Sequence, residues 1–158
     1  MIKIILKDIP SLDKIEVYEE NGGYAALRKA LMEMTPDEVT EEVKRSNLRG
    51  RGGACFPTGL KWTFMPKGND KPKYLCCNGD ESEPGSFKDR EIFEKNPHQF
   101  IEGVLLANYA MGIKTAYVYI RGEYYKWINI LEEKLQEAYK KGYIGNNILG
   151  TGFSTDIY

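Results

Sequence analysis

The second half of the sequence alternates short apolar runs with longer amphipathic ones. Residues 74–77 and 116–120 are apolar and bounded by polar turns, as expected of buried β-strands. Helical periodicity runs from about Asp89 to Met111, with an interruption near Pro97, and again from about residue 124 to 141. The order strand, helix, strand, helix is typical of parallel strands joined by a right-handed crossover. The sequence therefore predicts an α/β fold built on a parallel βαβα unit.

The first half predicts helices and one glycine-rich segment. The opening residues 1–7 read as a strand, and residues 24–34 have helical spacing. Thr35, Pro36 and Glu38 form a helix-start signal, with the helix running to about residue 46.

Two parts of the chain follow from this pattern. Residues 1–72 form an N-terminal segment with helices and a glycine-rich cofactor loop, and residues 73–158 form the first part of a Rossmann-like domain. The tail, residues 146–158, begins as a turn and finishes like a further strand, so we expect the sheet to be incomplete at the C-terminus.

The glycine-rich segment is the first candidate site. Between residues 48 and 68 it carries aromatic side chains that a flexible linker would not normally have. Glycines between Gly50 and Gly59 permit positive φ and close approach of backbone N–H groups to phosphate or to a flat ring. It is neither a dinucleotide fingerprint nor a P-loop, because a helix end precedes it and no Gly-Lys-Ser/Thr follows. A glycine-rich elbow that only packs is the structural alternative.

The second candidate is the acidic turn after the first predicted strand. Asn78 offers an amide that both donates and accepts, and Asp80, Glu81 and Glu83 offer carboxylates to ring N–H groups or sugar hydroxyls. A solvated turn whose acids cap the next helix is an equally good interpretation of the pattern alone. A calcium loop is a weaker one, because the acids lack regular alternate spacing.

In open α/β sheets, ligands bind outside the carboxyl ends of the strands. The turns 78–83 and 121–123 both lie at such ends, so we expect them to share one rim. For Arg121 and Glu123 we favour a local ion pair that fixes the turn over a role in binding.

Charge and composition exclude several other classes. The chain has 22 basic and 23 acidic residues, so it lacks the basic surplus of a nucleic-acid-binding protein. No apolar run approaches the ~20 residues that span a bilayer, which predicts a cytoplasmic protein with no direct membrane insertion. The three cysteines, Cys55, Cys76 and Cys77, and the single histidine lack metal-ligand spacing. Cys76 and Cys77 would point to opposite faces of a strand.

Five motifs occur in a specific order: residues 48–62, 77–90, the Pro97-His98 helix, 119–124 and 145–153. Together they resemble the F-type, FMN- and NADH-binding subunit of respiratory complex I, a module similar to those of NAD-reducing hydrogenases and NAD-dependent formate dehydrogenases. The resemblance covers about residues 20 to 158. It implies an NADH dehydrogenase, acting on quinone or another acceptor, in which NADH passes hydride to FMN and electrons then leave to iron–sulfur clusters.

The resemblance also implies a set of site residues. Glu83 matches a glutamate that contacts NADH and is the expected catalytic residue, while Lys61 matches a loop lysine. The full expected cofactor-binding set is Gly50, Arg51, Gly52, Gly53, Ala54, Phe56, Thr58, Gly59, Lys61, Phe64, Asn78, Asp80, Glu81 and Glu83.

Partners follow from the same resemblance. They are the other subunits of a multi-subunit oxidoreductase, including a thioredoxin-like subunit with a 2Fe-2S cluster, through which the protein would sit peripherally on the inner membrane. The family's 4Fe-4S cluster is expected only in a C-terminal part that this sequence does not contain.

Two departures from the family pattern bear on function. Residue 55 is Cys where the family has Gly, and a Cβ at positive φ would cost ~1 kcal/mol or more. The family also continues beyond this stretch with a turn that completes the flavin pocket. We therefore expect the isolated chain to be nearly inactive, and the alternative function is a non-catalytic assembly or interaction fragment that keeps the fold without binding flavin.

Overall fold

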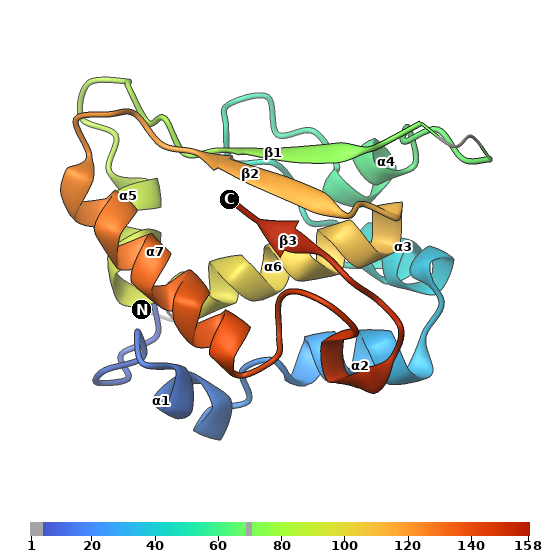
Figure 1. Ribbon diagram of the computed structural model, residues 1–158. Helices are drawn as coiled ribbons and strands as arrows, with labels where there is room; N and C mark the ends of the chain where they lie inside the picture. Colours follow the sequence, from blue (N-terminus) through green and yellow to red (C-terminus); the bar gives the residue numbers. More distant parts are fainter. Residues whose placement is uncertain (1–4, 69–70) are drawn as a thin grey trace.

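The computed structural model describes residues 5–68 and 71–158. A three-stranded sheet lies along one side of the molecule, with helices packed beneath it (Figure 1). The strands are β1 (Tyr74–Asn78), β2 (Thr115–Tyr119) and β3 (Asp156–Ile157), in the order β1-β2-β3. Both pairs are parallel, with Asn78 opposite Tyr119 and Ala116 opposite Ile157. The predicted α/β fold with a parallel βαβα unit is confirmed.

Three helices connect and cover these strands. They are α5 (Lys88–Lys95), α6 (Pro97–Met111) and α7 (Tyr125–Lys140). The interruption predicted near Pro97 is confirmed: Asn96 has an extended φ of −150°, and the proline begins α6, where a missing N–H costs nothing. Gly112, at φ 66°, closes α6 in the left-handed region.

The N-terminal half contributes four helices that lie away from β2 and β3 (Figure 1). They are α1 (Ile15–Glu20), α2 (Ala25–Glu33), α3 (Pro36–Arg45) and α4 (Thr58–Trp62); a 3-10 turn, η1 (Ile148–Gly150), lies in the tail. The start of α3 is the capping box that the sequence predicts. Neither α1 nor α4 was predicted.

The predicted opening strand is wrong where the structure describes it. Residues 1–4 lie outside the described residues, and residues 5–7 belong to no strand. A strand there would need a partner, and none of the described pairings involves this segment, since the three-stranded sheet is formed by later residues.

One large core joins both halves of the chain. Tyr24 and Leu27 of the N-terminal half are fully buried beside Ile101, Leu105 and Ala116, which are also fully buried. The division at residue 72 stays a prediction, although this core takes side chains from both sides of it. Among the described residues, no helix is both long and apolar enough to cross a bilayer.

A buried carboxylate anchors the N-terminal half onto α6. Glu102 is 6% exposed and accepts hydrogen bonds from the backbone N–H groups of Tyr24 and Leu27, both at 3.0 Å, and from the hydroxyl of Tyr18. Burial and this hydrogen bond raise the pKa of Tyr18. The charge of Glu102 therefore lies at the N-terminus of α2, where unpaired N–H groups favour an anion.

Candidate functional site

The glycine-rich segment folds back on itself as a hairpin-like loop. The N–H of Gly50 donates to the carbonyl of Phe56 at 2.9 Å, and the N–H of Thr58 donates to Leu48 at 2.8 Å. Residues 51–55 form the tip, with Gly53 at φ 107° and Cys55 at φ 50°. The sequence-based concern about residue 55 is therefore justified, because this non-glycine residue occupies the left-handed region.

The loop leads directly into α4, which is held close to α3. Gly59 is buried, and a Cβ at this position would lie 2.6 Å from the backbone nitrogen of Lys44. Only glycine permits this approach, and Lys61 follows two residues later on the same short helix. The glycine thus positions the lysine.

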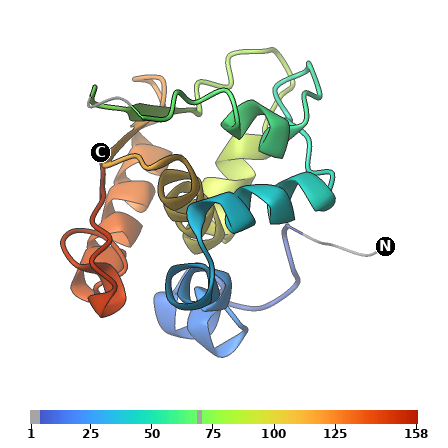
Figure 2. The same cartoon turned by 90° about the vertical axis from the view of Figure 1, so that its right-hand side faces the viewer.

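The loop, α4 and β1 enclose a cavity of about 770 Å³. Figures 1 and 2 both place α4 beside β1. Seven predicted site residues line the cavity: Gly50, Gly52, Ala54, Phe56, Thr58, Lys61 and Phe64. The rings of Phe56 and Phe64 are 5.9 Å apart and both are exposed, so they offer aromatic surface to a ligand. Arg51, Gly53 and Gly59 belong to the same segment without lining the cavity.

Sequence reasoning missed part of the cavity wall. The additional lining residues are Cys55, Trp62, Met65, Pro66, Leu75, Cys76 and Met111. Strand alternation could have indicated Cys76: it is exposed, whereas its neighbour Cys77 is half-buried and packs on the core. The contribution of Met111 had no sequence signal, because it depends on how α6 packs.

Asn78 ends β1 on the same face as Cys76, since the two residues are two positions apart. Its side-chain oxygen accepts the N–H of Asp80 at 3.2 Å, and Asp80 in turn accepts a hydrogen bond from Ser82. Asn78 does not itself line the cavity. It lies on the sheet face that Cys76 shares, next to the cavity.

Glu81 has a different setting from the other acids of the turn. Its side chain is 0% exposed and accepts from the N–H groups of Asp89 at 2.7 Å and Arg90 at 3.2 Å, and from the Arg90 Nε at 3.1 Å. Burial opposes ionisation, but these hydrogen bonds prevail and lower the pKa of Glu81. The carboxylate therefore caps α5, in line with the helix-capping interpretation, and its contact with a ligand stays a prediction. Glu83 is exposed.

The two turns share one rim, as predicted. The N–H of Gly79 donates to the carbonyl of Tyr119 at 2.7 Å, and the hydroxyl of Tyr124 donates to the carbonyl of Glu81 at 3.0 Å. The predicted ion pair of Arg121 with Glu123 is confirmed, with nitrogen–oxygen distances of 3.1 and 3.0 Å.

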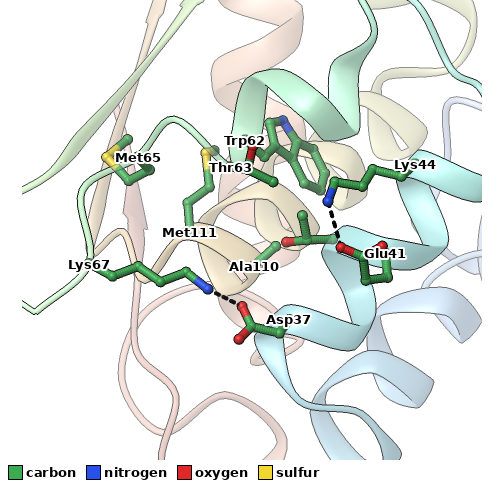
Figure 3. Close-up of a pocket in the computed structure, with 10 residues that line it drawn as sticks. Asp37, Glu41, Lys44, Trp62, Thr63, Met65, Lys67, Ala110 and Met111 are labelled. Carbon is green, nitrogen blue, oxygen red and sulfur yellow. Dashed lines mark hydrogen bonds and ion pairs between the residues drawn. The ribbon is translucent and has the colours of Figure 1, made fainter.

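A second, smaller cavity of about 330 Å³ lies between α3, α4 and α6 (Figure 3). It shares Trp62, Met65 and Met111 with the larger one. Its charged side chains pair with one another, Lys67 with Asp37 and Lys44 with Glu41. Such exposed pairs contribute little individually and leave no charge free for a ligand.

The described residues contain no group of three or more His, Cys, Asp or Glu that could hold a metal. The single histidine, His98, is fully buried, with its ring nitrogens 3.0 Å from the Tyr24 hydroxyl and from Glu137. Burial lowers the pKa of His98 more than the neighbouring carboxylate raises it. It is a neutral core residue.

Known sequences share this arrangement of motifs. Residues 43–155 match the family model described as the Nuo51 FMN-binding domain. The chain is 60% identical over 151 residues to an F-type subunit of NADH-quinone oxidoreductase, the one numbered 2, from Rhizobium meliloti, covering 96% of this chain and 36% of that protein. It is 53% identical over 149 residues to the F-type subunit of NADH-quinone oxidoreductase from Aquifex aeolicus, covering 94% of this chain and 34% of that protein. The chain thus spans about a third of the length of these curated relatives.

A solved structure agrees with both fold and sequence. An NAD+-reducing NiFe-hydrogenase in its H2-reduced state matches with a TM-score of 0.65 and 36% identity. The match covers 77% of this chain and 21% of that one.

Proposed function

This chain belongs to the family of the Nuo51 FMN-binding domain, and from that premise we propose that it binds FMN and NADH as the N-terminal part of an NADH:acceptor oxidoreductase. One observation carries the proposal. The glycine-rich loop, Lys61 and two aromatic side chains line one cavity against β1, whose exposed face leads to Asn78.

The residues present fit a flavin mononucleotide. Small-molecule sites are mostly apolar clefts of roughly 300–1,000 Å³ with a few polar groups, and this cavity has that size and character. The backbone of the loop can approach a ligand closely at Gly50 and Gly52, and Lys61 supplies a positive charge for a phosphate. Phe56 and Phe64 offer flat apolar surface to a ring.

The rim residues would hold the polar edges. The Asn78 amide can donate to one ring-edge atom and accept from another, while Asp80 and the exposed Glu83 can accept from sugar or amide groups of NADH. Glu81 holds the turn in place through α5 and offers its backbone to the ligand. Bound FMN would supply the redox chemistry by accepting hydride from NADH, so the chain's own residues orient the two rings and exclude water.

Electron transfer onward would need other parts. We propose that electrons pass to iron–sulfur clusters, with the 4Fe-4S cluster in the stretch of the relatives that this chain does not match and a 2Fe-2S cluster in a thioredoxin-like partner subunit. A peripheral position on the inner membrane through such a complex follows from the same proposal. The proposed activity is therefore that of the assembled protein.

A second candidate function is a non-catalytic fragment that keeps the fold. The chain's match to only about a third of the relatives favours it. The cavity with its retained Lys61 favours flavin binding.

Replacing Lys61 tests the proposal. We expect Lys61→Ala to raise the dissociation constant for FMN about tenfold, because a charge-assisted hydrogen bond to phosphate contributes roughly 1.5–3 kcal/mol when it is desolvated and less in an open site. Quenching of FMN fluorescence during titration measures it. Lys29→Ala, which removes an exposed lysine of α2, is the matched control and should leave the constant unchanged. Equal affinities for the parent chain and the Lys61 variant, or no quenching by the parent chain, would support the non-catalytic candidate.

A further inference from the structure

We propose that Cys55 and Cys76 form a thiol modification site inside the cofactor cavity, where mixed-disulfide formation with a low-molecular-weight disulfide excludes FMN. The inference rests on the proposed function for its consequence, the loss of binding. It rests on the structure alone for the site itself.

The two thiols come from distant parts of the chain and meet at one cavity. Cys55 lies at the tip of the glycine-rich loop and Cys76 in the middle of β1; both line the cavity, and both residues are exposed. The third cysteine differs. Cys77 faces the core, and burial, with a smaller contribution from Cys76, raises the pKa of its thiol to about 11. Thiolates are the reactive form, so Cys77 is the internal control for both access and reactivity.

The loop tip has room to accept an adduct. Its closing hydrogen bonds join Gly50 to Phe56 and Leu48 to Thr58, outside the tip itself. An added Cβ at Gly52 or Gly53 would meet no atom within 4 Å, so the backbone around Cys55 is loosely packed. Lys61 lines the same cavity and would attract an anionic adduct such as glutathione.

The chemistry needs only the named reagent. A cysteine thiolate attacks one sulfur of glutathione disulfide, whose S–S bond breaks while a new S–S bond to the protein forms. One glutathione leaves as a thiolate and takes up the proton that the cysteine lost. The protein sulfur is oxidised and half of the reagent is reduced, so the step balances without another oxidant. A tripeptide held at either sulfur would occupy the space that we assign to the flavin.

Peptide mapping by mass spectrometry after treatment with glutathione disulfide tests the site. We expect Cys55 and Cys76 to be modified well before Cys77, and FMN present during the reaction to slow both. The modified chain should lose FMN fluorescence quenching and regain it after reduction with dithiothreitol. FMN binding by the double variant Cys55→Gly/Cys76→Ser should be the same before and after treatment.

Two results would overturn the inference: modification of Cys77 as fast as the other two, or unchanged FMN binding after complete modification of Cys55 and Cys76. If the untreated chain binds no FMN, the proposed function fails instead. The order of modification then still decides whether the two cavity thiols form the reactive site.

Discussion

Glu102→Ala is expected to lower the free energy of unfolding by about 3–5 kcal/mol, because it leaves the N–H groups of Tyr24 and Leu27 and the Tyr18 hydroxyl buried without their acceptor. Domains of this size have roughly 5–15 kcal/mol in total, so the loss is a large share. Urea denaturation followed by circular dichroism measures it. The N-terminal half should loosen first, since Glu102 joins the start of α2 to α6.

Glu132→Ala is the matched control for that experiment. Glu132 is an exposed glutamate of α7, and its removal should change the unfolding free energy by less than about 0.5 kcal/mol. Should Glu102→Ala fail to fold at all, Glu102→Gln keeps the shape and one acceptor oxygen and should show a smaller loss. An unfolding free energy for Glu102→Gln equal to that of the parent would show that the carboxylate is not the anchor.

Gly59→Ala is expected to lower the unfolding free energy by about 1–3 kcal/mol, as overpacking of a tight contact does. The added Cβ would lie 2.6 Å from the backbone nitrogen and 2.9 Å from the Cα of Lys44, and backbone atoms cannot rotate away. Helix α4 must therefore shift from α3, which carries Lys61 with it and weakens FMN binding. Urea denaturation and FMN titration on the same sample measure both effects.

Gly103→Ala gives a control with the opposite sign. Gly103 lies inside α6, and a Cβ there would meet nothing within 4 Å. Alanine at an open helical position should stabilise by roughly 0.5–1 kcal/mol. If Gly59→Ala matches the parent in both stability and binding, the close approach of α4 to α3 does not position Lys61.

The elements with strong periodicity could be predicted from the sequence. The βαβα order, the capping box at Thr35 and the break before Pro97 all follow from local chemistry that the structure retains. Helices α1 and α4 could not be predicted in this way, because they have only 6 and 5 residues and show too little periodicity to register. Their helical form depends on packing against the rest of the chain.

The candidate site divides along the same line. Residues of the glycine-rich loop could be chosen from local composition, because positive φ and missing side chains are local properties. The cavity wall formed by Cys76 and Met111 depends on tertiary packing. Glu81 shows a further limit: its neighbours in sequence are as acidic as it is, yet only this carboxylate folds back onto α5 and loses its exposure. Spacing alone does not distinguish it from Glu83.

The central claim is that the glycine-rich loop and the end of β1 bind the same ligand. Mapping backbone amide NMR shifts of the 18.1 kDa chain during FMN titration tests this claim most directly. The account predicts that shifts concentrate in residues 50–61 and at Asn78 and Gly79, and follow one binding curve. Shifts confined to the cavity between α3 and α6 around Asp37 and Glu41, or separate curves for the loop and for Asn78, would contradict it.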